Sequence, residues 1–217
     1  MVRRCGSAAG RHGDGGLRAM SDNFTWLIDP AVSLDAAPAQ AQRMIAWLQA
    51  AGIVGTAMRV GDLYREWGKT WGLKESHLTA IDRTGYPPGP HHANACDARA
   101  NLPPSIPNWL EVAVERRIFD AGGNGLEIFC PACNAEQTAL GDAWGDAFSD
   151  WFKGDDAAPL VCGACGHRQA VTQWRYDPPW AFGNLGFNFQ NWLLSDAFIA
   201  EFTAAYGQPL AVVHQHI

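Results

Sequence analysis

Four cysteines of this chain have a spacing that could hold a metal ion. They form two Cys-x-x-Cys pairs, Cys130 with Cys133 and Cys162 with Cys165, and twenty-eight residues separate the pairs. A zinc ion bound by thiolates needs four sulfur atoms at about 2.3 Å in a tetrahedron, and two short turns that each present two sulfurs supply that set. A shell of four thiolates leaves no open position for a substrate. We therefore expect one structural Zn²⁺ and no catalytic residues.

The residues around each pair favour the turns that such a site needs. A residue that readily adopts positive φ follows the second cysteine of each pair, Asn134 in the first turn and Gly166 in the second. Pro131 pre-sets the first turn, and Gly163 eases the second. Both turns therefore suit a metal site by their local sequence as well as by their number of cysteines.

The motifs Cys-Pro-x-Cys and Cys-Gly-x-Cys-Gly resemble the knuckles of the zinc-ribbon superfamily, in which the tips of two β-hairpins hold one structural zinc. The resemblance covers roughly residues 126–174. It implies strands before the first pair and after the second, and it makes the ligands Cys130, Cys133, Cys162 and Cys165. The gap between the pairs exceeds the usual spacing of about 15 to 20 residues. A ribbon with an inserted helix and another zinc-knuckle arrangement are both open.

Other interpretations of the cysteines also stay open. A strand followed by Cys-Pro-x-Cys and then a helix is typical of a thioredoxin-like centre, where the helix terminus lowers a thiol pKa. Two disulfides, or inert buried thiols, need no metal. We favour zinc because a redox dithiol has no need of a second, matching pair. His167 could replace one thiolate, but we expect it to point away and, like Arg168, to offset the charge of the cage from outside.

Hydrophobic periodicity predicts the elements that position the cysteines. Alternating apolar residues predict a strand over 110–118, and the glycine-rich residues 121–125 turn the chain into a hairpin partner over 126–129. A helix over 140–152 fills the gap between the pairs, and a strand over 169–174 follows the second pair. We also expect a helix from Ser195 to Gly207 and a closing strand over 210–214.

The N-terminal half is predicted to be mainly helical, with an amphipathic helix between Asp35 and Gly52 and a second helix over 61–71. Six prolines between residues 85 and 108 block helix and central strand. We therefore expect an α+β chain in three parts. They are a disordered basic tail (1–19), a mainly helical part (20–108) with a proline-rich junction (85–108), and an antiparallel zinc-knuckle part (109–217) with an inserted helix and a C-terminal helix and strand.

Charge and hydropathy limit the classes of partner. The chain has a formal charge of −6, and its first nineteen residues carry a net +3, so residues 20–217 carry −9. An acidic chain is a poor match for nucleic acid, whose affinity comes largely from Lys and Arg. No stretch approaches the roughly 18 apolar residues of a membrane span, and the start lacks the apolar centre of a secretory signal. We expect a cytoplasmic protein, with Met20 as an alternative start.

Two regions are candidates for contact with a partner protein. Three acids at intervals of four follow one side of the helix between the cysteine pairs: Asp142, Asp146 and Asp150. We interpret them as a solvated face, with a docking site for a basic partner as the alternative. The uncharged segment 180–192 is rich in aromatic residues and asparagine. We interpret it as core, with a recognition patch as the alternative; the contacting residues would then be Phe182, Asn184, Phe187, Phe189 and Trp192.

The sequence as a whole favours a non-enzymatic protein-binding or adaptor protein, because phosphate-binding loops, His-Glu-x-x-His and Gly-x-Ser-x-Gly are all absent. One alternative is a nucleic-acid-associated factor, which the zinc-ribbon resemblance implies. Another is a metal-dependent hydrolase that uses His91, His92, Asp97 or His214 with a second metal. We interpret these residues, and the further possible ligands Cys96 and His216, as merely polar.

Overall fold

A computed structural model of the chain describes residues 22–71, 83–97, 108–123, 125–138 and 141–216. The predicted basic tail and the alternative start at Met20 lie outside these residues. Within them the fold is α+β, with four α-helices and antiparallel β-sheets, as the sequence predicts.

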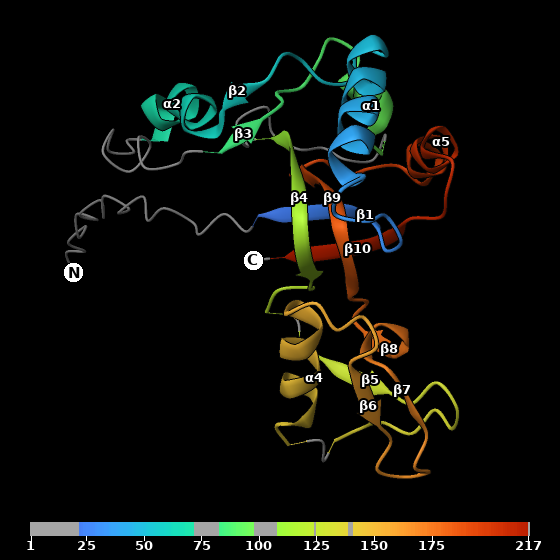
Figure 1. Cartoon of the computed structure of the whole chain (residues 1–217). Coiled ribbons are helices and arrows are strands. Elements are labelled where there is room, and N and C mark those ends of the chain that lie inside the picture. The colour runs from blue at the N-terminus through green and yellow to red at the C-terminus, as the bar shows by residue number, and fades with distance from the viewer. Residues whose placement is uncertain (1–21, 72–82, 98–107, 124, 139–140, 217) are drawn as a thin grey trace, which may run out of the picture.

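A four-stranded antiparallel sheet forms the centre of the molecule (Figure 1), with the strand order β10-β1-β9-β4. The strands are β1 (Asn23–Asp29), β4 (Trp109–Phe119), β9 (Ala181–Gln190) and β10 (Ala211–His216). Strand β1 pairs with β10 along one edge and with β9 along the other. The sheet therefore crosses the boundary that we predicted between residues 108 and 109, because a segment from the N-terminal part lies inside it.

Helices α1 (Ala37–Ala50) and α5 (Asp196–Tyr206) pack on one face of this sheet. Both helices match the periodicity of the sequence. The Ser195 side chain caps α5 by accepting the Phe198 N–H, and Gly207 ends the helix with a φ of 88°. Their apolar stripes enclose buried residues from β1, β4 and β9 in one core cluster: Leu27, Leu110, Leu185, Phe187 and Phe189.

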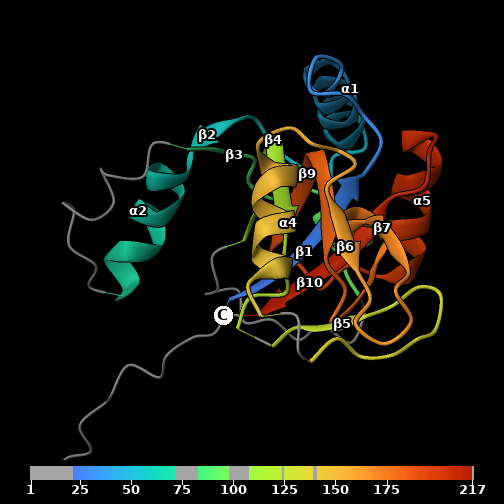
Figure 2. The same ribbon diagram turned by 60° about the horizontal axis from the view of Figure 1, so that its bottom comes forward.

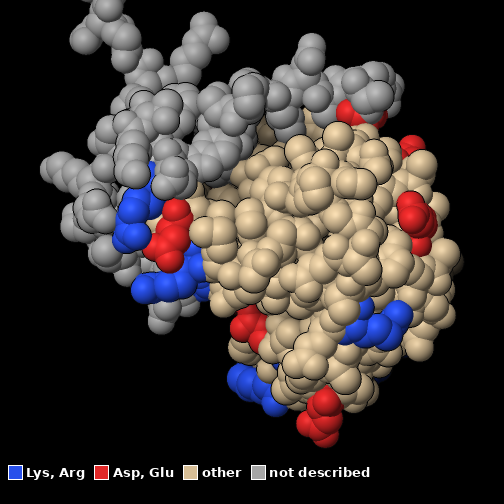
Figure 3. Space-filling view, turned by 90° about the horizontal axis from the view of Figure 1, so that it is seen from above, with Lys and Arg blue, Asp and Glu red and all other residues tan. Residues whose placement is uncertain are grey.

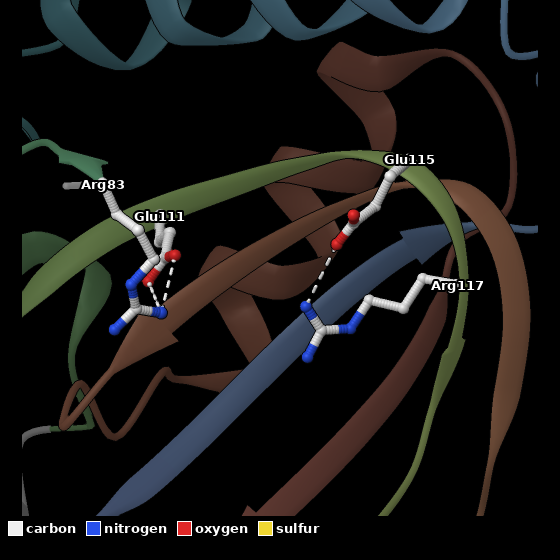
Figure 4. A network of polar contacts seen from close by, with 4 residues as sticks. All are labelled: Arg83, Glu111, Glu115 and Arg117. Atoms are coloured by element: carbon white, nitrogen blue, oxygen red, sulfur yellow. Dashed lines mark hydrogen bonds and ion pairs between the residues drawn. The ribbon is translucent and has the colours of Figure 1, made fainter. Parts of the chain in front are cut away.

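The opposite face of the sheet carries a smaller cluster around Trp26 and Phe119, whose rings lie 5.0 Å apart. Gly186 is required here, since a Cβ at this position would lie 2.5 Å from the Phe119 ring. Two ion pairs follow β4 (Figure 4), Arg83 with Glu111 at 2.9 Å and Arg117 with Glu115 at 3.4 Å. Both pairs are at least partly exposed, so they contribute little to stability.

The remaining elements of the N-terminal half lie beside β4 and α1. They are β2 (Met58–Arg59), α2 (Val60–Trp71), β3 (Thr84–Gly85) and the short 3₁₀ helix η1 (His92–Ala95). The described part of the proline-rich segment is tied to the end of α1, because Gly89 donates to the Ile53 carbonyl and His91 to the Gly52 carbonyl. A Cβ at Gly89 would overlap the Gly52 carbonyl oxygen, so only glycine fits this approach.

A second lobe, which we call the knuckle lobe, contains residues 125–180 and extends from one end of the sheet (Figures 1 and 2). It holds α4 (Ala143–Phe152), β5 (Glu127–Phe129), β6 (Pro159–Val161), β7 (Arg168–Ala170), η2 (Val171–Gln173) and β8 (Arg175–Asp177). Its core is a cluster of its own, is rich in rings and includes Phe182 from the start of β9: Phe148, Trp151, Trp174, Tyr176 and Phe182. Residues 169–174 form a short strand and a 3₁₀ turn instead of the single strand we predicted.

The predicted hairpin between residues 110–118 and 126–129 is wrong. Strand β4 pairs with β9, from Trp109 opposite Gln190 to Phe119 opposite Ala181, whereas β5 pairs with β8. The long apolar β9 offers β4 a partner along its whole length, which the three-residue β5 cannot. The residues after β4 lead the chain out of the sheet and into the knuckle lobe.

Candidate metal centre

The four cysteines of the two motifs come together in the knuckle lobe. Their sulfur atoms all lie within 4.8 Å of one another. Two pairs that join the motifs lie at 3.8 Å (Cys130 and Cys165) and 3.7 Å (Cys133 and Cys162). A tetrahedral zinc site with bonds of about 2.3 Å has sulfur–sulfur edges of about 3.8 Å. The cluster thus has the size of a coordination shell, and it could ligate one metal ion.

The two Cys-x-x-Cys turns, which we call the knuckles, repeat one backbone pattern. In each, the N–H of the first cysteine donates to the carbonyl five residues later, and the N–H four residues later donates back to that cysteine. The N–H two residues later approaches the first sulfur at 3.4 Å in both knuckles. Positive φ falls where the sequence predicts it, at Asn134 (58°) and Gly166 (73°). Two similar short sequences thus build two similar halves of one site.

Different neighbours hold the two knuckles. Strands β6 and β7 form a hairpin whose tip carries the second knuckle. The first knuckle follows β5 and returns through a bridge between Phe129 and Glu136. Arg175 braces this first knuckle from β8, with its guanidinium 3.7 Å from the Phe129 ring centroid and a hydrogen bond of 3.0 Å to the Asn134 side chain. The first knuckle therefore depends on a residue forty-one positions beyond it.

Gln137 connects the knuckles, and sequence reasoning missed it. Its Nε2 donates to the Ala135 carbonyl at 2.7 Å and approaches the Cys162 sulfur at 3.4 Å, while its Oε1 accepts the Gly163 N–H at 2.9 Å. The Gln137 amide thus connects the segment that follows the first knuckle to the backbone and to a sulfur of the second knuckle. A local signal for this role is absent, because it depends on where a segment twenty-five residues away is placed.

The pKa values of two of the four cysteines are shifted in opposite directions. Burial raises the pKa of Cys162, but hydrogen bonds from the Cys165 and Ala164 backbone lower it to about 6 overall. For Cys165, the His167 backbone lowers the pKa, whereas the surrounding thiols, Cys133 first, raise it to about 12. The Cys162 thiolate therefore forms easily, and its negative charge raises the free energy of forming further thiolates beside it. A bound divalent cation would remove that cost by balancing the crowded negative charge.

The other interpretations of the cysteines fit the geometry less well. The described cysteines form no disulfide. A thioredoxin-like centre needs a helix that begins at its thiols, but α4 begins at Ala143, ten residues after Cys133. The His167 ring lies 2.7 Å from the Gln169 side chain, outside the sulfur cluster. The cluster therefore offers four sulfur ligands and no nitrogen ligand.

Among the described residues the sulfur cluster is the one group of three or more potential ligands with metal-site geometry, and the alternative second site at residues 91–97 is not such a group. The His92 ring lies 3.1 Å from the Gly89 carbonyl, and Cys96 donates to the His92 carbonyl. His214 and His216 do share a face of β10. Their rings lie beside different residues of β1, however, Thr25 at 3.4 Å and Asn23 at 2.9 Å.

The predicted partner-binding residues divide into two groups. Four aromatic residues of the segment 180–192 are core, with at most 4% of their surface exposed: Phe182, Phe187, Phe189 and Trp192. The interpretation of this segment as core therefore holds for the four rings, and the alternative recognition patch is corrected because they are buried. Asn184, half-buried, donates to the Val32 carbonyl. The acidic residues of α4 are all exposed: Asp142, Asp146 and Asp150.

Comparison with protein-family models, curated proteins and solved structures finds no match to this chain. In the part of the chain that the structure describes, the helices are too short or too polar to cross a bilayer. Seen from above (Figure 3), the described surface carries scattered charges of both signs and no broad field of Lys and Arg. The sulfur cluster is therefore the main structural indication of function among the described residues.

Proposed function

We propose that the chain binds one structural zinc ion through Cys130, Cys133, Cys162 and Cys165, and that the knuckle lobe stabilised by this ion binds another protein. The observation that carries the proposal is the match between the sulfur–sulfur distances of 3.7 and 3.8 Å and the edge of a zinc–thiolate tetrahedron, about 3.8 Å. The likeness of the motifs to zinc-ribbon knuckles supports zinc as the metal.

A structural role is favoured over a catalytic one because four thiolates fill a tetrahedral shell. The ion would join two segments that lie far apart in the sequence, residues 130–133 and 162–165. Strands β5 to β8 have only three residues each, so backbone pairing alone holds the lobe weakly. Zinc binding would supply much of the free energy that keeps these short elements folded.

Helix α4 is the surface that we propose for protein binding. Asp142, Asp146 and Asp150 are exposed along one side of it, and two rings outside that row are partly bare, Trp144 with 38% and Phe152 with 59% of its surface exposed. Aromatic rings are enriched at protein interfaces, and a row of carboxylates beside them selects for a basic partner. We therefore propose a partner protein with Lys or Arg around an apolar depression.

Elemental analysis and native mass spectrometry of the purified full chain test the metal. We expect one zinc per chain, and loss of that zinc when Cys130 and Cys162 are both changed to Ser. The variant Cys96→Ser is the control, because Cys96 lies outside the sulfur cluster. A chain with no metal, or with several, would contradict the proposal.

A paired cross-linking experiment tests the partner. We expect proteins that are cross-linked to the wild-type chain to be lost in Phe152→Ser combined with Asp150→Asn. The control combines Leu34→Ser with Asp35→Asn, which also removes one exposed apolar side chain and one exposed carboxylate, but outside α4. Equal loss in both variants, or in neither, would contradict binding through α4.

A further inference from the structure

Two of the four cysteines in the sulfur cluster are open to solvent. Cys133 and Cys165, the second cysteines of the two knuckles, are exposed, whereas Cys130 and Cys162 are buried. The other residues of the knuckles are small and exposed as well: Pro131, Ala132, Asn134, Gly163, Ala164 and Gly166. Small reagents in solution can therefore reach the cluster from the tips of the knuckles.

The sulfurs also differ in the N–H groups that contact them. Three N–H groups lie 3.4 to 3.5 Å from the Cys162 sulfur: the backbone of Ala164 and Cys165 and the side-chain amide of Gln137. The exposed Cys165 sulfur accepts from the His167 backbone. Within the described chain, the Cys133 sulfur contacts the Cys162 sulfur at 3.7 Å and has no N–H donor. Because N–H donors draw negative charge from a thiolate, Cys133 presents the exposed sulfur with the most available charge.

An exposed thiolate with a second thiolate beside it reacts with hydrogen peroxide in two steps. In the first step the Cys133 sulfur attacks one peroxide oxygen, the O–O bond breaks, hydroxide leaves, and Cys133 becomes a sulfenic acid. In the second step the Cys162 thiolate attacks the Cys133 sulfur, a disulfide forms, the S–O bond breaks, and a second hydroxide leaves. The two sulfurs give two electrons to the peroxide, and two protons from solvent convert both hydroxides to water.

This reaction removes ligands from the metal. Thiolates bind zinc, and a sulfur in a disulfide is no longer a thiolate. One round of the reaction leaves Cys130 and Cys165, whose sulfurs lie 3.8 Å apart, as the remaining pair. A second peroxide can oxidise this pair in the same way, because Cys165 is exposed. Bound zinc and disulfides therefore exclude each other in the cluster.

We propose that the sulfur cluster is a peroxide-sensitive zinc site, in which the Cys133 thiolate reacts first and the Cys162 thiolate closes the disulfide. This inference rests on the proposed zinc site and adds a regulation to it. Cys130 and Cys162 belong to the core cluster that also contains Phe148 and Trp151 of α4. Loss of the metal would thus loosen the packing beneath the proposed protein-binding surface, and oxidation would weaken binding through α4.

Zinc release from the reduced full chain tests the proposal, with a chromophoric chelator that reports free zinc. We expect excess hydrogen peroxide to release all of the zinc, and a phosphine reductant with added zinc to restore the bound metal. The intact mass should fall by two hydrogens for each disulfide. After one equivalent of peroxide, a peptide map should show Cys133 joined to Cys162 as the first disulfide. The same chain without peroxide is the control, and it should keep its zinc.

Two matched variants identify the thiolate that reacts first. Cys133→His and Cys165→His each replace one exposed thiolate by an imidazole, which is also a zinc ligand. We expect Cys133→His to have lost little zinc when release from the wild type is complete, and Cys165→His to have lost all of it. Equal rates in the two variants would overturn the assignment of Cys133.

If either variant binds no zinc, the peptide map of the wild-type chain decides, and a first disulfide that lacks Cys133 would overturn the assignment. A chain that keeps its zinc in excess peroxide would contradict this inference and leave the proposed zinc site standing. A chain that is isolated without zinc would contradict both.

Discussion

At the scale of single residues, Gln137 links the two knuckles. It follows the first knuckle in the sequence, and its side-chain amide contacts the backbone and a sulfur of the second. Groups that orient the ligands of a metal typically contribute about 10- to 100-fold to its affinity. We expect Gln137→Leu to weaken zinc binding by about tenfold in competition with a chromophoric chelator. Gln208→Leu, at an exposed position outside the lobe, should leave the affinity unchanged. Equal affinities for the two variants would contradict the role.

A buried pair of side chains, Tyr206 and Asp29, predicts one contribution to instability at alkaline pH. Tyr206 donates to the buried Asp29 carboxylate at 2.5 Å, and the pKa of Tyr206 is raised by burial and then by Asp29. A raised pKa stabilises the fold fully below the value of about 10 for an unfolded tyrosine, and this contribution is lost as pH rises above it.

We therefore expect the midpoint of urea unfolding to fall as the pH rises above about 10. Tyr206→Phe should reduce this fall but cost about 1 to 3 kcal/mol at neutral pH, since the buried carboxylate loses a donor. Tyr86→Phe, at a less buried ring, is the comparison. A pH dependence that is identical in Tyr206→Phe and the wild type would argue against Tyr206 as its source.

At the scale of elements, two glycines of the second knuckle differ in their backbone conformation. Gly166 has a φ of 73° and open space where a Cβ would lie, whereas Gly163 has no positive φ and only the Gln137 oxygen nearby, at 3.9 Å. We expect Gly166→Ala to destabilise the zinc-bound chain by about 1 kcal/mol, the cost of a left-handed alanine. Gly163→Ala should change stability by less than about 0.5 kcal/mol. Equal effects in thermal unfolding would mean that the left-handed turn is unimportant.

Elements built by local interactions could be predicted from the sequence, and pairings between distant segments could not. The spacing of apolar residues and the flanking Ser195 and Gly207 fix α5 within a few positions of the chain, so its prediction is confirmed. The partner of β4 depends on β9, which lies about seventy residues later, and periodicity along one strand carries no information on its partner. The same reason explains why the strand β1 was not predicted inside the sheet.

The candidate site, too, could be predicted only where it depends on local sequence. Cysteine spacing identifies the four sulfurs because each knuckle is a local turn, and their convergence confirms that part of the prediction. Gln137 and Arg175 act across gaps of twenty-five and forty-one residues. Their roles exist only once the lobe has folded, so the sequence alone could not assign them.

At the scale of the whole molecule, the chain has two cores with different sources of stability. The clusters on the two faces of the sheet are built from long strands and helices, with buried residues such as Leu27 and Phe187. The cluster of the knuckle lobe is built on strands of three residues and includes Cys130 and Cys162 themselves. Strand β9 begins in the second cluster, where Phe182 contacts Phe148 and Trp151, and continues into the first, so the two cores meet at this end of the sheet.

This division predicts the effect of removing the metal. A strong chelator should unfold the knuckle lobe, because metal binding and folding are coupled in such sites, and should leave the sheet folded. In hydrogen exchange followed by mass spectrometry, we expect peptides from residues 127–138 and 159–170 to lose protection. Peptides from β1 and from the second half of β9 should keep it, because their bonds lie within the sheet. Restoring zinc should restore protection. Loss of protection in both regions at once would mean that the chain folds as one cooperative unit around its metal.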